Sequence, residues 1–385
     1  MTPAFQRPAL ELAEVVRRHG HRLGDLNGEQ RRILRAIASC RTAALGGHVE
    51  SCDRCHYQRI AYNSCRNRHC PKCQASACAR WMEDRAAELL PVEYFHVVFT
   101  LPDVFNPLAL ANKRVVYGVL FDTVARTLSE VADNPKHLGA KIGFIGILHT
   151  WGQNLCLHPH VHCVVPGGGI SPEGKWISCK PGFLLPVRVL SKVFRGKFID
   201  LLKQARGKLI GAEGTDAFDQ LLNASVKHDW VVYAKRPFGG PEQVLKYLAR
   251  YTHRIAISNR RLVSIDSQSV TFKWKDYAHH NKPRTMTLDG AEFLRRFLMH
   301  AVPGGFMRIR HFGLLANRVR SRNLQRCRSL INAASQNMSV VPVVVVPTNQ
   351  TDHRRCPACA HGRLIAGPNL SPPELRPIIL RLDSS

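Results

Sequence analysis

The residues of this chain best suited to chemistry are two histidines, His160 and His162, in the run HPHVHCVV at residues 158–165. The apolar end of that run predicts a strand buried in a sheet, and the glycines at 167–169 predict the turn that ends it. Because side chains two residues apart on a strand project from the same face, both imidazoles point in one direction. Two imidazoles presented in this way are half of a metal site, so the run predicts a catalytic cation.

The other ligands of that cation are left open by the sequence. Gln153 is our first candidate for a third ligand, because it lies seven residues before the histidine pair at the mouth of the predicted hairpin, and His149 and His158 follow. Cys163 and Val164 stand where a binuclear zinc hydrolase would need aspartate and histidine. Imidazole suits zinc and manganese, whereas an added oxygen ligand and a phosphate substrate favour magnesium or manganese. We therefore expect Mg²⁺ or Mn²⁺.

Two tyrosines, Tyr247 and Tyr251, lie four residues apart on what the sequence predicts to be one helix face. Aromatic residues on an apolar helix face more often belong to a core than to an active site. Here Arg250, His253 and Arg254 share the helix, in a basic chain that also carries the paired histidines. A tyrosine can attack a phosphodiester to form a phosphotyrosine ester, while a bound cation polarises the phosphate. We therefore predict that both tyrosines are catalytic and that Arg250 and Arg254 contact DNA.

Two cysteine pairs, Cys52-x-x-Cys55 and Cys70-x-x-Cys73, predict one structural Zn²⁺ site near the N-terminus. Fourteen residues separate the pairs, a spacing typical of two hairpins that each supply two thiolates. The set of four stays open, because three neighbours in sequence compete as ligands: Cys65, His69 and Cys78.

A third pair, Cys356-x-x-Cys359, lies near the C-terminus between His353 and His361. A single pair does not complete a site, so whether it binds zinc is left open. The chain has thirteen cysteines and no predicted export signal, which favours reduced thiols and metal ligation over disulfides.

The charge of the chain predicts an anionic partner. Lys plus Arg number 55 against 28 Asp plus Glu, a net charge of +27 over 385 residues. Nucleic acid fits this excess better than a membrane surface, because no basic amphipathic helix, lipid anchor or long apolar span is evident. We expect a cytoplasmic protein that associates with the bacterial nucleoid through DNA.

A basic stretch at residues 308–328 is predicted to bind the DNA backbone, with leucines at 314, 315 and 324 seating one helix face. The arginines predicted to contact DNA in its first part are Arg308, Arg310, Arg318, Arg320 and Arg322.

The elements that would position these residues alternate between strands and helices. Apolar and β-branched runs predict strands at 93–101, 142–150, 159–165 and 229–234, and later at 254–258, 262–265 and 270–274. Helices are predicted at 106–132, 189–210 and 215–224, and the tyrosine helix follows Gly240-Pro241. Short links favour antiparallel neighbours, so the expected class is α+β.

We expect four parts. Residues 1–92 are predicted to hold N-terminal helices and the four-cysteine zinc domain, and residues 93–275 the catalytic domain. Residues 276–334 are predicted to form a basic helical DNA-binding extension. Residues 335–385 are predicted to be a linker and a tail that carries the last cysteine pair.

Taken together, these motifs resemble the HUH-endonuclease transposases of the two-tyrosine, rolling-circle branch, the insertion-sequence-ninety-one-like elements. The resemblance rests on the cysteine module, on HTWGQNL at 149–155, on the histidine strand with PGGG at 166–169, on YLARYTHR at 247–254 and on RIRHFG at 308–313. It runs from about residue 10 to 330 in one consistent order. The implied fold is a central antiparallel sheet with flanking helices beside a small zinc-binding module.

The resemblance implies metal-dependent nicking of single-stranded DNA at element ends, a 5′-phosphotyrosine, and strand transfer into target DNA. Host replication proteins are a further candidate partner class. A plasmid relaxase or rolling-circle replication initiator is the alternative with the same chemistry; the cysteine module and the Tyr-x-x-x-Tyr order argue against it. A zinc-dependent DNA-binding protein without catalysis is the second alternative, which the absence of a covalent DNA adduct would reveal.

Overall fold

The computed structural model of the chain describes residues 10–74, 85, 88–212, 215–235, 256–276, 279, 282–335 and 355–372. Among these residues, no helix is both long and apolar enough to cross a membrane.

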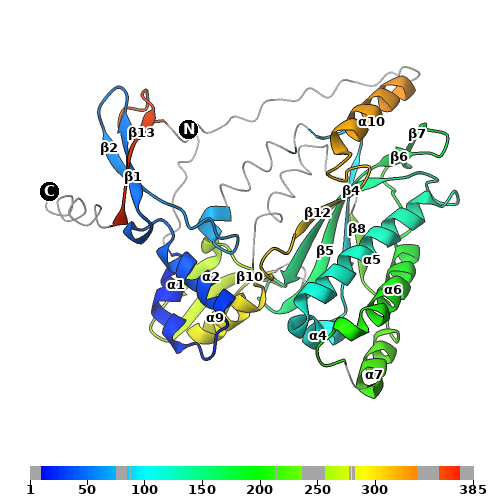
Figure 1. The fold of residues 1–385 in the computed structure, drawn as a ribbon, viewed down its shortest axis with the longest axis horizontal. Helices are drawn as coiled ribbons and strands as arrows, with labels where there is room; N and C mark the ends of the chain where they lie inside the picture. The colour runs from blue at the N-terminus through cyan, green and yellow to red at the C-terminus, as the bar shows by residue number, and fades with distance from the viewer. Residues whose placement is uncertain are drawn as a thin grey trace.

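A five-stranded antiparallel sheet forms the centre of the fold (Figure 1), as the predicted α+β class requires. Its strands, in spatial order, are β12 (Ile309–Gly313), β4 (Gly143–Trp151), β5 (Leu157–Pro166), β3 (Tyr94–Thr100) and β8 (Val232–Lys235). The two innermost pairs, β4 with β5 and β5 with β3, are the longest, because β5 carries ten residues that are mostly buried. The histidine strand therefore occupies the middle of the sheet.

Helices cover one face of this sheet (Figure 1). The two longest, α5 (Lys113–Asp133) and α6 (Val187–Gln204), pack side by side, with α4 (Asn106–Ala111) and α7 (Thr215–Ser225) at one end. Alternate strand residues such as Phe99, Leu148 and Val161 point into this layer and are fully buried there. The residues between them, the histidines of β5 included, point to the opposite face.

A second core lies beside the sheet and joins two parts of the chain that we expected in separate domains. Helices α1 (Leu12–His19) and α2 (Gly28–Ser39) pack with α9 (Gly290–Met299) and with the sheet β11-β10-β9. The strands of that sheet are β9 (Leu262–Ile265), β10 (Ser269–Asp276) and β11 (Lys282–Asp289). The predicted boundaries after residues 92 and 275 therefore do not match the structure, because α1 and α9 share one apolar core.

The predicted extension at 276–334 is also not helical throughout, because it contains β11 and β12 as well as α9 and α10. Residues 309–313 form β12, the edge strand of the central sheet, paired antiparallel with β4 so that Ile309 lies opposite Ile147. The only helix after β12 in the described residues is α10 (Arg320–Ser335). Leu314 and Leu315, expected on a helix face, instead follow β12 and pack beside a small β6–β7 hairpin (Gly168–Ile170, Trp176–Ser178).

A third sheet joins the two ends of the chain. It has the order β13-β1-β2, formed by β1 (Gly47–Cys52), β2 (Gln58–Tyr62) and β13 (Leu364–Leu370). Residues 364–370 are thus a strand of the N-terminal module, so the predicted separate tail at 335–385 does not describe this part of it.

Hydrogen bonds link the N-terminal module to the segment that leads into β12. The Arg68 guanidinium donates to the carbonyls of Val302, Pro303 and Phe306 at 2.6–2.9 Å. Nε2 of His69 accepts from the amide of Val302 at 3.2 Å. These contacts join the cysteine-rich loop to the central sheet.

Candidate functional site

Three histidines from β4 and β5 converge on the sheet face opposite the α5–α6 layer. His160 and His162 project together from β5, as their spacing predicted, and His149 of β4 lies directly opposite His160 in the strand register. One ring nitrogen of each lies within 4.8 Å of the others. The ring centroids of His149 and His162 are 4.3 Å apart and nearly perpendicular. The arrangement offers three imidazole ligands to one cation.

Hydrogen bonds set which nitrogen of each strand histidine faces the cluster. Nδ1 of His160 lies 2.6 Å from the carbonyl oxygen of His158, which can only accept, so Nδ1 carries the proton and Nε2 keeps its lone pair. Nδ1 of His162 lies 2.7 Å from Nε2 of His96, on the neighbouring strand β3. That contact leaves Nε2 of His162 for the cluster as well.

Burial keeps these rings neutral, which is the protonation state that a metal ligand needs. Desolvation lowers the pKa of His160 to about 3 and that of His162 well below its usual value, and neighbouring histidines lower both further. Burial also lowers the pKa of His96 to about 4. At neutral pH His160 and His162 can therefore bind a cation without first losing protons.

His96 was missed by sequence reasoning. It lies in a strand that is otherwise aromatic and β-branched, and its ring stacks on His162 with centroids 4.9 Å apart. The alternation of side chains along β3 could have placed His96 on the histidine face. His96 lies on the same face as Tyr94 and Val98, opposite to the buried Phe95 and Val97.

The structure brings His149 into one group with His160 and His162. Gln153 lies in the turn between β4 and β5, where its backbone carbonyl accepts from the Arg261 guanidinium. His158 faces outward, with Nδ1 3.6 Å from the Asp103 carboxylate. Gln153 as a ligand therefore stays a prediction, whereas the cluster of His149, His160 and His162 is a feature of the structure.

Trp151 and Arg308 form the side of the site next to His149. The Trp151 indole stacks on the His149 ring at 4.4 Å between centroids, and the Arg308 guanidinium lies 6.0 Å from the Trp151 ring. Desolvation, with a smaller contribution from Arg68, lowers the pKa of Arg308 to about 10, which still leaves it charged at neutral pH. A positive charge is thus held near the cluster.

The other arginines of the basic stretch divide into two groups. Arg310 packs over the rings of Phe121 and Phe306, and Arg320 lies 3.0 Å from the Glu88 carboxylate. Arg318 and Arg322 are exposed. The exposed pair is free of the packing that occupies Arg310, so it is the better placed of the two groups to meet a DNA backbone.

Four residues predicted to act in catalysis or DNA contact lie outside the described part of the chain: Tyr247, Tyr251, Arg250 and Arg254.

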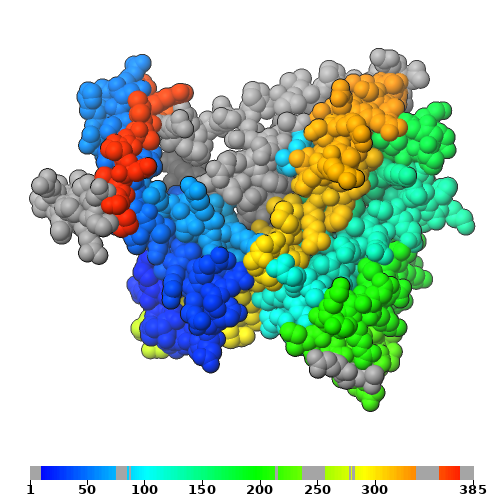
Figure 2. All heavy atoms as spheres, in the orientation of Figure 1, coloured from blue at the N-terminus to red at the C-terminus, as the bar shows by residue number. Residues whose placement is uncertain are grey.

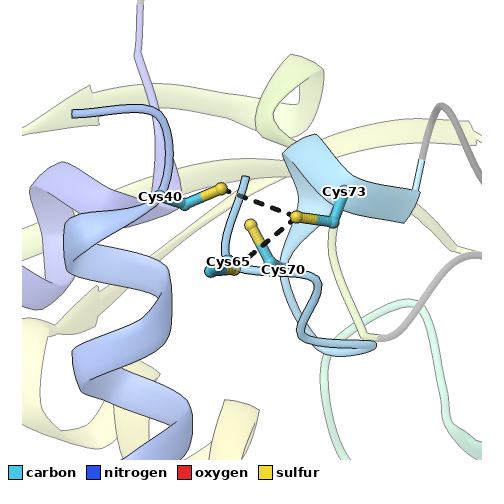
Figure 3. A group of neighbouring side chains, drawn as sticks. All are labelled: Cys40, Cys65, Cys70 and Cys73. Atoms are coloured by element: carbon cyan, nitrogen blue, oxygen red, sulfur yellow. Dashed lines mark hydrogen bonds between the residues drawn. The ribbon is translucent and has the colours of Figure 1, made fainter. Parts of the chain in front are cut away.

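A group of four cysteines lies at the edge of the second core (Figure 3). Cys40 follows α2, Cys65 lies in the loop after β2, and Cys70 and Cys73 form the predicted pair. Sγ of Cys73 is 3.5 Å from Sγ of both Cys40 and Cys65. Four thiolates about 2.3 Å from one zinc ion would be about 3.8 Å apart, so the spacing suits a structural zinc.

The predicted set of Cys52, Cys55, Cys70 and Cys73 is therefore not the set that the structure brings together. Cys70 and Cys73 pair with Cys40 and Cys65, while Cys52 and Cys55 lie beside the C-terminal pair at 356 and 359. Regular Cys-x-x-Cys spacing identified three pairs but not which pairs meet. Cys40, which belongs to no such pair, carried no motif that would have revealed it.

Comparisons with known proteins agree with this architecture. Residues 143–323 match the family described as "Putative transposase", and residues 12–101 match the family described as "Transposase zinc-binding domain". The first match spans both histidine strands and most of the basic stretch, up to residue 323. The second spans the helices and cysteines of the N-terminal module.

Two curated proteins are similar over most of the chain. "Putative transposase y4qJ" of Sinorhizobium fredii (strain NBRC 101917 / NGR234) is 51% identical over 381 residues, which cover 93% of this chain and 95% of the relative. "Transposase for insertion sequence element IS801" of Pseudomonas savastanoi pv. phaseolicola is 27% identical over 355 residues, which cover 87% of this chain and 83% of the relative.

Proposed function

Because the chain belongs to the insertion-sequence-ninety-one-like transposases with an N-terminal zinc-binding domain, we propose that it nicks one DNA strand at the ends of an insertion sequence and transfers that strand by rolling-circle transposition. The observation that carries this proposal is the convergence of three imidazoles on one sheet face. A cation held there would lie where a scissile phosphate can reach it. The expected substrates are single-stranded DNA at the element ends and target DNA.

His149, His160 and His162 would hold the catalytic cation through one ring nitrogen each. Of the two expected ions, this nitrogen-rich ligand set favours Mn²⁺ over Mg²⁺, which prefers oxygen ligands. When bound, the cation would supply Lewis-acid polarisation of the phosphate. His96 would hold His162 in the tautomer that binds, since its Nε2 accepts the Nδ1 proton.

Tyr247 and Tyr251 would supply the nucleophiles. A tyrosine oxygen forms a bond to the phosphorus while the bond from phosphorus to the 3′-oxygen breaks, and the leaving oxygen takes a proton to become a 3′-hydroxyl. The phosphoester is conserved in the 5′-phosphotyrosine, so a later attack by a 3′-hydroxyl rejoins DNA without ATP. Two nucleophiles would let one hold the element while the other cuts the second strand.

Exposed arginines would bind the DNA backbone near this site. Arg318 and Arg322 fit that role from the described residues, and Arg250 and Arg254 follow from their position on the predicted tyrosine helix. The Cys40–Cys73 group would bind one Zn²⁺ and stabilise the loop through which Arg68 contacts the segment before β12.

The proposal is tested by incubating the full chain and Mn²⁺ with a labelled single-stranded oligonucleotide from an element end. Wild type should form a covalent adduct that survives denaturation, and mapping the labelled peptide should place it on Tyr247 or Tyr251. The double variant Tyr247→Phe/Tyr251→Phe should form none, whereas Tyr233→Phe, which changes an exposed tyrosine of β8, should behave as wild type. An adduct that persists in the double variant would refute the assignment.

A further inference from the structure

A second group of four cysteines is formed by residues from opposite ends of the sequence. Cys52 ends the β1 strand and Cys55 lies in the turn after it, and Cys356 and Cys359 precede β13, about 300 residues later. Sγ of Cys52 is 3.8 Å from Sγ of Cys359, and Sγ of Cys55 is 3.6 Å from Sγ of Cys356. Thiolates around one zinc ion would be about 3.8 Å apart, so these separations match a tetrahedral site and are too long for disulfides.

Backbone amides point at the sulfurs of both halves. Sγ of Cys52 accepts from the amides of residues 54 and 55 at 3.4 and 3.5 Å. Sγ of Cys356 accepts from the amide of residue 358 at 3.4 Å, and Sγ of Cys359 from that of Gly362 at 3.3 Å. A neutral thiol is a weak acceptor, whereas a thiolate accepts such bonds well. Both turns are therefore formed to stabilise negative sulfur.

The backbone conformation after the second cysteine is the same in the two halves. His56 follows Cys55 with φ +57°, and Ala360 follows Cys359 with φ +58°. This left-handed conformation is unfavourable for residues other than glycine and persists only where the surroundings impose it. The first cluster repeats the pattern, because two residues that directly follow its cysteines are also left-handed: Arg41 and Arg66. The shared strain indicates that all four turns serve the same purpose, which is to position the preceding cysteine in its four-cysteine group.

Apart from the β1–β13 ladder, little except these cysteines would hold the junction together. Its apolar core in the described residues consists of Cys52, Cys356 and Leu364, with Cys359 packed against them. The Gly362 position is so close to Cys52 that an added Cβ would lie 2.3 Å from Sγ. Small modules with so little apolar surface commonly depend on a metal or disulfide for stability.

We propose that Cys52, Cys55, Cys356 and Cys359 bind a second zinc ion, which fastens β13 to the N-terminal hairpin. Figure 2 shows the segment at 355–372 (red) lying along that hairpin (blue). The zinc-binding family match ends at residue 101, so half of this site lies outside it. The site is separate from both the Cys40–Cys73 group and the histidine cluster.

The test is the metal content of the purified full chain, measured by mass spectrometry for zinc and iron. Eight thiolates in two closed sites would hold about two zinc ions per chain. Cys356→Ser and Cys52→Ser should each lose one zinc ion, and the double variant should lose no more than either single variant. Cys156→Ser, which changes an exposed cysteine outside both groups, is the matched control and should lose none.

Two further results would overturn the proposal. If Cys356→Ser retained all its zinc, Cys356 would not be a ligand and Cys52 and Cys55 would belong to a different ligand set. Iron in place of the second zinc ion would show that the site binds a different metal. Trypsin sensitivity distinguishes local loss of this junction from misfolding of the whole chain. Zinc loss in Cys356→Ser should expose Arg355 and Arg363 to cleavage several-fold faster, while the fragment that carries β4 and β5 stays protected.

Discussion

Replacing His96 with alanine should weaken binding of the catalytic cation without unfolding the sheet. The variant removes the 2.7 Å hydrogen bond to Nδ1 of His162 and the stacked ring beside it. The imidazole of His162 is then free to rotate and to adopt the tautomer that cannot bind through Nε2. Loss of such a supporting hydrogen bond typically costs about 10- to 100-fold in metal affinity, which is about 1.4–2.7 kcal/mol.

The assay is calorimetric titration of the full chain with Mn²⁺, together with the Mn²⁺ dependence of oligonucleotide cleavage. In His96→Ala, the Mn²⁺ dissociation constant and the Mn²⁺ concentration that gives half-maximal cleavage should both rise about 10- to 100-fold. The cleavage rate relative to wild type should be higher at saturating Mn²⁺ than at limiting Mn²⁺. His96→Gln, whose amide oxygen can accept from the same proton, should recover most of the affinity.

Val98→Ala is the matched control, because Val98 lies on the same face of β3 directly opposite His162 but offers no hydrogen bond. It should lose packing and keep metal affinity. If His96→Ala bound Mn²⁺ as tightly as Val98→Ala, the positioning role of His96 would be wrong.

Two other predictions concern DNA contact and acid stability. Three exposed arginines are suited to phosphate contact: Arg318, Arg322 and Arg326. Changing all three to glutamine should flatten the slope of log DNA affinity against log salt by about two to three units. Arg320→Gln should change the slope less, because the Arg320 side chain is paired with Glu88. A slope in the triple variant equal to that of wild type would contradict this prediction. Burial lowers the pKa of His300 to about 4. The folded state therefore does not bind a proton that the unfolded state binds near pH 6.5. The free energy of unfolding should fall as the pH drops between these two values, by up to about 1.4 kcal/mol per pH unit. In urea unfolding at pH 7 and 5, the advantage of wild type over His300→Gln should shrink at the lower pH; an advantage independent of pH would exclude this titration.

The strands around the histidines could be predicted because their signals are local. Alternation and apolar runs placed β3, β4 and β5 within one or two residues, and the predicted strand at 262–265 matches β9. The pairing of His149 with His160 was harder to see. The ladder between β4 and β5 shifts between His149 and Trp151, so the register could not be counted back from the turn.

Long-range association could not be predicted in the same way. Cys52 meets Cys359, and α1 packs against α9, through contacts that no periodicity in either segment reports. Residues 308–313 were assigned by their charge, but Ile309 and Phe312 with their neighbours pair with β4 as an edge strand. The charge of this stretch did not indicate its conformation, and its contact with DNA stays a prediction.

The pairing of β13 with β1 has a consequence for the order in which the chain can fold during synthesis. Domains generally fold as they leave the ribosome, N-terminal parts first. Here β1 and β2 emerge early, yet the third strand of their sheet arrives only with residues 364–370, after every strand of the histidine sheet has been made. The first module to be translated is therefore the last to be completed. Copies of the gene with a late stop codon should yield an intact central sheet attached to an unfinished N-terminal module.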